Sequence, residues 1–85
     1  MITPPITNLP SVISLIPQRP PMVMVDALLS YTATTGAAGL TIAADNLFVQ
    51  NGHLQEAGVV EHIAQSIALH KVYYYYLQHQ PAPMG

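Results

Sequence analysis

The chain has 85 residues, of which 51% are hydrophobic and only 7% are charged, and its formal net charge is -2. An ordinary soluble domain carries roughly 25% charged residues, so much of the apolar surface here needs a partner. With only two basic side chains, the sequence lacks the cationic surface that neutralises phosphates, which excludes a typical nucleic-acid-binding module.

The length also limits the core, because a chain of this size forms one domain at most and buries roughly 60% of its unfolded surface. The absence of cysteine excludes disulfides and a thiolate zinc site. Residues 1–10 lack the charged start and apolar centre of a signal peptide. No apolar run approaches the roughly 20 residues of a membrane-spanning helix. We therefore expect a soluble, cytoplasmic protein that does not enter a membrane and that self-associates.

The first half of the chain predicts one short element and a hairpin. Residues 11–16 (SVISLI) form either a short helical turn or a strand, stopped by the following proline. After further prolines that favour extended backbone, residues 22–30 (MVMVDALLS) read as a strand. Residues 40–43 (LTIA) alternate in polarity and predict a second strand. The threonine-rich stretch 31–36 would join the two strands in a hairpin-like turn.

One long helix is predicted over residues 58 to about 79, because the sequence after Gly58 contains neither glycine nor proline until Pro81. Its apolar residues recur at helical spacing, at Val59, Val60, Ile63, Ile67 and Val72. Apolar and small residues also fill the flanks, so we expect the helix to be buried around most of its circumference. Residues 78–85 read as an extended tail.

The most informative polar residue is Glu61, a carboxylate in the first turn of this helix. An ionised group in apolar surroundings is costly unless it is paired or used in chemistry. Gln65 follows four residues later, so the two side chains share a face and can hydrogen-bond the same object. The alternative is that Glu61 only complements the helix dipole.

A histidine lies just before the helix. Asn51-Gly52 is a strong turn dipeptide, and it places His53 on a loop near the helix N-terminus. An imidazole and a carboxylate there can divide general acid and base work between them. The alternative for His53 is an ordinary exposed loop residue.

The other candidates have weaker signals. His62 and His70 lie eight residues apart, two helical turns, which is too far to share an ion, so no metal site is expected. The rings of Tyr73 to Tyr76 point in nearly all directions and either cover the end of the helix or form a recognition site. Arg19 is either a solvated loop residue or an anchor for a carboxylate or phosphate.

Three segments carry a resemblance to a known family: 15–26 (LIPQRPPMVMVD), 51–54 (NGHL) and, most specifically, 58–65 (GVVEHIAQ). Together they resemble the hot-dog-fold 3-hydroxyacyl-acyl carrier protein dehydratases over residues 15 to about 77. The nearest are the small dehydratase-like proteins of aryl polyene or related lipid clusters. The resemblance implies an α+β hot-dog fold, in which an antiparallel sheet wraps around a long central helix.

The resemblance also implies a reaction, the dehydration of a 3-hydroxyacyl thioester on acyl carrier protein to the 2-enoyl thioester. His53 would remove the C2 proton, Glu61 would act on the hydroxyl, and backbone N–H groups near Gly58 would hold the thioester oxygen. Gln65 would orient Glu61 and help to bind the substrate. No metal or cofactor is implied. In the family the two catalytic side chains come from different subunits, which implies a dimer.

Two questions stay open from the sequence. A hot-dog sheet needs several strands after the central helix, whereas this sequence ends at Gly85. Residues 1–85 are therefore expected to form a single partial hot-dog domain, with the remaining strands supplied by a longer protein or by another chain. The second question is the chemistry, because a thioesterase-like hydrolase on the same fold and a noncatalytic acyl-binding or assembly subunit are alternatives to the dehydratase.

Overall fold

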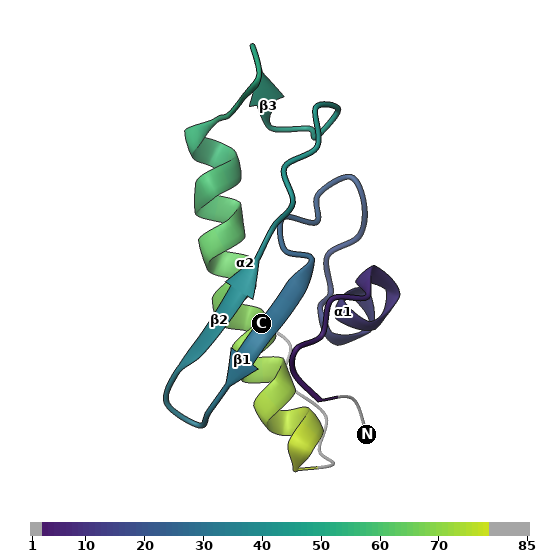
Figure 1. The fold of residues 1–85 in the computed structure, drawn as a ribbon, viewed down its shortest axis with the longest axis vertical. Coiled ribbons are helices and arrows are strands. Elements are labelled where there is room, and N and C mark those ends of the chain that lie inside the picture. The colour runs from purple at the N-terminus through teal and green to yellow at the C-terminus, as the bar shows by residue number, and fades with distance from the viewer. Residues whose placement is uncertain (1–2, 79–85) are drawn as a thin grey trace.

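A computed structural model describes residues 3–78 of the chain. The long helix α2 (Glu56–Leu77) runs along most of the molecule, and the other elements pack against it (Figure 1). These elements are α1 (Leu9–Leu15), β1 (Ala27–Tyr31), β2 (Gly36–Gly39), β3 (Val49–Gln50) and β4 (His53–Leu54). The strands form two separate two-stranded antiparallel sheets, β1–β2 and β3–β4. The architecture is thus mixed α and β, with one dominant helix.

The short N-terminal element is a helix, so the helical alternative for residues 11–16 is confirmed. Asn8 caps its start by accepting a hydrogen bond from the Ser11 N–H at 3.2 Å. Arg19 closes the other end, where its guanidinium donates to the carbonyl oxygens of Ile13 at 3.2 Å and Ile16 at 2.8 Å. Carbonyls at a helix C-terminus lack intrahelical partners, and a cation there is favourable. Arg19 therefore stabilises α1.

The predicted hairpin exists, but the prediction of its second strand at residues 40–43 is wrong. In the structure β2 lies at Gly36–Gly39, where Leu28 pairs with Ala38 and Tyr31 pairs with Gly36. The reason is a tight turn, in which the Thr32 N–H donates to the Thr35 carbonyl at 2.8 Å. Because a turn fixes the register of the strands that it joins, the return strand has to begin directly after Thr35.

The predicted strand over residues 22–30 is only partly confirmed, since β1 begins at Ala27. Residues 22–26 have the sequence pattern of a strand. In the structure, however, the backbone of Met24 forms hydrogen bonds with side chains of α2 instead of with a neighbouring strand. On its other side β1 pairs at one point with Ile6, which exchanges two backbone hydrogen bonds with Leu28 at 2.7 and 2.9 Å. The hairpin therefore has a short third partner from the N-terminal segment.

The turn predicted at Asn51-Gly52 is confirmed as the two-residue loop of the β3–β4 hairpin. Both residues have positive φ, 52° at Asn51 and 77° at Gly52. Such a pair is what a type I′ hairpin turn requires, and Asn-Gly is its preferred sequence. The loop pairs Gln50 with His53 immediately before α2 begins.

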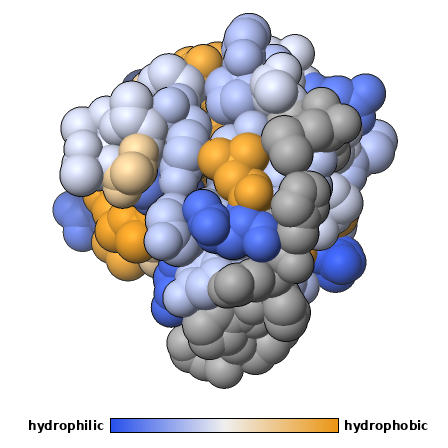
Figure 2. Space-filling model, turned by 90° about the horizontal axis from the view of Figure 1, so that it is seen from below, coloured by the Kyte–Doolittle hydropathy of each residue, from blue (hydrophilic) through white to orange (hydrophobic). Residues whose placement is uncertain are grey.

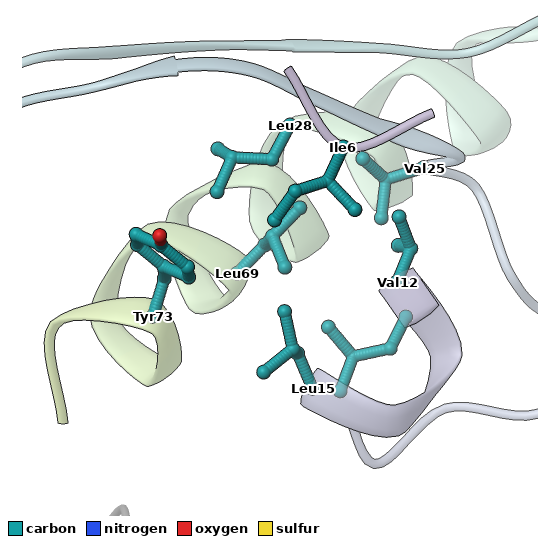
Figure 3. Packing of buried hydrophobic residues seen from close by; sticks show 8 residues of the cluster. Ile6, Val12, Leu15, Val25, Leu28, Leu69 and Tyr73 are labelled. Carbon is teal, nitrogen blue, oxygen red and sulfur yellow. The ribbon is translucent and has the colours of Figure 1, made fainter. Parts of the chain in front are cut away.

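The hydrophobic core lies between α1, β1 and the C-terminal half of α2 (Figure 3). Leu69 and Tyr73 from α2 meet Val12 from α1 and Leu28 from β1, and all four are at most 1% exposed. Burial of its ring, with a smaller contribution from the neighbouring Tyr76 and then Tyr31, raises the pKa of Tyr73. The tyrosines of the run 73–76 therefore have different environments: Tyr73 lies in the hydrophobic core, whereas the side chain of Tyr74 is 42% exposed.

The expectation that α2 is buried around most of its circumference is wrong for this chain by itself. Gly58, Gln65, Leu69 and Tyr73 are buried along one face. Along another face four aliphatic side chains are largely exposed: Val59 (43%), Val60 (62%), Ile63 (53%) and Ile67 (66%). The physical reason is that two short hairpins and one short helix have too little surface to wrap a 22-residue helix. These four residues are called the aliphatic face of α2 below.

Figure 2 views the end of the molecule that carries the β1–β2 turn and the C-terminal end of α2, and hydrophobic residues appear there as separate patches among polar ones. Over residues 3–78, neither α1 nor α2 combines the length and the apolar character that a helix needs to cross a membrane.

Candidate functional site

The site is built around Glu61, which is half-buried in the second turn of α2. Its Oε1 accepts a hydrogen bond from Gln65 Nε2 at 3.1 Å, one helical turn further along. Gln65 is itself only 1% exposed. A buried amide keeps one orientation only when its donors and acceptor are bonded. The orientation of Glu61 therefore depends on the other partners of Gln65.

Gln65 is held by the extended segment 22–24, which crosses α2 beside it. Its Oε1 accepts from the Met24 N–H at 2.7 Å, and its Nε2 donates to the Met22 carbonyl at 2.9 Å. The side-chain amide thus replaces the neighbouring strand that this backbone would otherwise need. Each of these bonds is buried or partly buried, so losing one would leave a desolvated backbone group unpaired.

His62 of α2 also binds the segment 22–24. Its Nδ1 lies 2.6 Å from the Met24 carbonyl oxygen, and the ring is half-buried. Gln65 and His62 therefore bind the N–H and the carbonyl of the same residue, Met24, and Gln65 also binds Glu61. Successive helical residues turn by about 100°, so Gln65 points about 40° from Glu61 and lies between Glu61 and His62 around the helix. The three side chains share one sector of α2.

Gly58, the predicted substrate-binding glycine, is buried beneath the β3–β4 hairpin. A Cβ atom at this position would lie 2.7 Å from both Leu54 Cδ1 and Phe48 Cβ, so only glycine fits without movement. The Gly58 N–H donates to the Gln55 carbonyl at 2.9 Å. The first two N–H groups of α2, on Glu56 and Ala57, have no hydrogen bond within residues 3–78 and lie beside Gly58. These two groups are the donors that the helix N-terminus offers.

His53 lies on β4, with its side chain exposed. Its backbone pairs with Gln50, but within the described part of the chain its imidazole makes no hydrogen bond. Within one chain the structure therefore joins Gln65 to Glu61 and places His62 next to them on Met24. Among residues 3–78 the His53 side chain makes no hydrogen bond to any of the three.

His62 is the residue that sequence reasoning missed, because its partner, the Met24 carbonyl, lies 38 positions away in the chain. Its signal is its place directly after Glu61 and three residues before Gln65, on the sector of α2 that faces residues 22–24. His70 has a separate structural role, since its Nε2 lies 2.8 Å from the Thr32 carbonyl and 3.1 Å from that of Thr35, in the β1–β2 turn. Among residues 3–78 no three His, Cys, Asp or Glu side chains gather as a metal site.

A separate pocket of about 280 Å³ lies between the β1–β2 hairpin and α2. Its lining includes Ala38 and Gly36 from β2 and Ser66, Ile67 and His70 from α2. The pocket does not include Glu61, His62 or Gln65, so it does not belong to the hydrogen-bonded site described above.

Comparison with protein families gave a match, over residues 10–85, to the family described as ApeP-like, ApeP dehydratase. The matched range contains every residue of the site around Glu61. Neither the curated proteins nor the solved structures gave a match.

Proposed function

Because the chain belongs to the ApeP-like dehydratase family, we propose that it removes water from a 3-hydroxyacyl thioester to give the 2-enoyl thioester. The acyl group would be carried by acyl carrier protein. The observation that supports this proposal is the half-buried carboxyl of Glu61, held at one oxygen by Gln65. A carboxyl fixed in this way has its second oxygen left for proton exchange with a bound ligand.

In the proposed reaction Glu61 starts protonated and His53 starts as a neutral imidazole. The imidazole removes the C2 proton, and the electron pair of that C–H bond becomes the C2–C3 double bond as the C3–O bond breaks. Glu61 gives its proton to the departing hydroxyl, which leaves as water. The proton on His53 then returns through solvent to the Glu61 carboxylate, so the enzyme is restored.

The negative charge that develops on the thioester oxygen needs donors that are already in place. The N–H groups of Glu56 and Ala57, beside Gly58 at the positive end of α2, are suited to this role because no intrahelical carbonyl is available to them. Gln65 acts as a positioning residue, because its amide ties the carboxyl of Glu61 to the backbone of Met22 and Met24.

We propose that the active form contains at least two chains, in a hot-dog arrangement that covers the aliphatic face of α2. Four large aliphatic side chains in a row on one helix form a patch that a monomer rarely leaves in water. The same assembly would bring the exposed His53 of one chain toward Glu61 of another. The hot-dog sheet and the two-chain site are both parts of this proposal.

The proposal is tested by incubating the protein with a 3-hydroxyacyl thioester and following two signals. Dehydration raises the absorbance of the conjugated enoyl thioester and releases no free thiol. A thioesterase would release thiol without enoyl absorbance. The absence of both signals with several acyl chain lengths, from protein that is folded by circular dichroism, would favour a noncatalytic acyl-binding subunit and would overturn the dehydratase assignment.

A further inference from the structure

Met24 lies at the centre of the hydrogen bonds around Glu61, and each of its polar groups is bonded. Its side chain and backbone together are only 1% exposed. Its N–H donates to Gln65 Oε1 at 2.7 Å, its carbonyl lies 2.6 Å from His62 Nδ1, and its thioether accepts from Asn46 Nδ2 at 3.4 Å. A buried backbone group that loses its partner stays desolvated, which is unfavourable. The position of Met24 therefore depends on these side chains.

Gln65 and His62 together take the place of a neighbouring strand at Met24. In a hydrogen-bonded pair of an antiparallel sheet, the N–H and the C=O of one residue both bond to a single residue on the next strand. Here Gln65 bonds the N–H and His62 bonds the carbonyl, three residues apart on α2. Within residues 3–78, no backbone group bonds Met24 in place of either side chain. Losing one of the two bonds therefore leaves the segment 22–24 held at fewer points.

The two side chains differ in how they are connected to Glu61. Gln65 binds Glu61 directly, since its Nε2 donates to Oε1 at 3.1 Å. The same amide accepts from the Met24 N–H, so a displacement of Met24 also displaces the amide. His62 is connected to Glu61 by way of Met24 and Gln65, because its ring hydrogen bond within residues 3–78 is to the Met24 carbonyl.

We propose that His62 is a positioning residue, which holds the Gln65 amide in place through Met24 and thereby keeps the carboxyl of Glu61 oriented for proton transfer. His62 needs no contact with the substrate in this role. It only has to donate from Nδ1 to the Met24 carbonyl, which both the imidazolium and the neutral ring with its hydrogen on Nδ1 can do. The expected effect on turnover rests on the proposed dehydratase function, whereas the expected effect on Gln65 does not.

Two variants of nearly equal shape separate the hydrogen bond of His62 from the space that its ring fills. His62→Asn keeps an N–H donor near the Nδ1 position, whereas His62→Leu has no donor. If His62→Leu does not fold, His62→Gln takes its place, because its longer side chain carries the donor away from the Nδ1 position. Ser66→Ala is the matched control, since it removes a hydrogen bond of the same helical turn, from Ser66 Oγ to the His62 carbonyl at 2.7 Å, that does not involve Met24.

The first measurement is amide hydrogen exchange by NMR, which needs no substrate. Exchange of the Met24 N–H and of the Gln65 side-chain amide is compared with that of the Leu28 N–H, which is bonded elsewhere in the fold. In His62→Leu we expect the first two to exchange about tenfold faster relative to Leu28, while His62→Asn and Ser66→Ala keep the natural ratio. A general loss of stability would speed all three and leave the ratio unchanged. An unchanged ratio in His62→Leu overturns the inference.

The second measurement is the kinetics of dehydration, followed by enoyl absorbance. A positioning role predicts that His62→Leu lowers kcat by about tenfold with little change in KM, and that His62→Asn recovers most of the kcat. An unchanged kcat in His62→Leu, or an equal loss in Ser66→Ala, would contradict this role. If the natural chain shows no dehydration while the exchange ratio changes as expected, the dehydratase proposal is rejected and the positioning of Gln65 by His62 stands.

Discussion

The Gln65 amide donates to Glu61 at 3.1 Å and at the same time binds the crossing backbone at two points, the Met24 N–H and the Met22 carbonyl. Glu61 is thus oriented by a group that cannot rotate without breaking two further hydrogen bonds. An enzyme gains from such fixed geometry because a proton donor that is already in place needs no reorganisation during the reaction.

We expect Glu61→Gln to abolish turnover of a 3-hydroxyacyl thioester, by at least about a hundredfold, without changing the fold. The amide oxygen can still accept from Gln65, but the amide has no proton to exchange. Enoyl absorbance measures the activity, and circular dichroism checks the fold. The matched control is Asp45→Asn, the same chemical change at an exposed residue, which should keep full activity. Substantial activity in Glu61→Gln would remove Glu61 from the mechanism.

The two-chain site predicts complementation between inactive variants. His53→Ala and Glu61→Gln should each be inactive alone, because every site of such an assembly lacks one partner. After the two proteins are unfolded together and refolded, random pairing gives dimers in which one site is intact, and activity should recover to about a quarter of the natural value. If both residues of a site came from one chain, mixing would restore nothing. Retained activity in His53→Ala alone would exclude this residue as the base.

Self-association is predicted to depend on the aliphatic face of α2. Ile67 is 66% exposed in the single chain, so Ile67→Lys should leave the core intact. We expect the natural chain to sediment as a dimer or larger species at micromolar concentration and the variant to shift toward monomer. Ala33→Lys, in the exposed β1–β2 turn, adds the same charge elsewhere and should leave assembly unchanged. A monodisperse natural monomer would contradict the burial argument.

Gly58 is predicted to be essential for packing rather than for helix formation. A Cβ atom there would lie 2.7 Å from Leu54 Cδ1 and from Phe48 Cβ. We expect Gly58→Ala to lower the free energy of unfolding by about 1–3 kcal/mol, even though alanine favours helix. Urea unfolding measures the change. At Gly39 the nearest contacts of a Cβ atom are 3.7 and 3.8 Å, so Gly39→Ala is the control that should cost much less.

The elements that could be predicted from the sequence are those whose formation depends on neighbouring residues in the chain. The helix around Glu61 was predictable because no glycine or proline interrupts it, and the Asn51-Gly52 turn because few other dipeptides accept two positive φ angles. The position of β2 was not predictable, because it depends on the hydrogen bonds inside the Thr32–Thr35 turn. Residues 78–85, expected to be an extended tail, lie outside the described residues except for Gln78, which ends α2.

At the site, the Glu61–Gln65 pair was predictable from a spacing of four on one helix. The role of the segment 22–24 was not, because its bonds to Gln65 and His62 join residues about forty positions apart. An apolar run after prolines predicts a strand, and nothing local reveals that side chains will take the place of its neighbouring strand. His62 was missed for the same reason, since its partner is a distant carbonyl.

The short N-terminal bridge at Ile6 makes the two edges of the β1–β2 sheet different. Ile6 already occupies the outer side of β1 at Leu28 through two backbone hydrogen bonds. The outer side of β2, by contrast, is an unpaired edge within residues 3–78. Its residues Gly36 to Gly39 have small side chains that allow a neighbouring backbone to approach. A strand added to this sheet, whether from the same protein or from a second copy, can therefore align against β2, whereas on β1 it would have to displace Ile6 from Leu28.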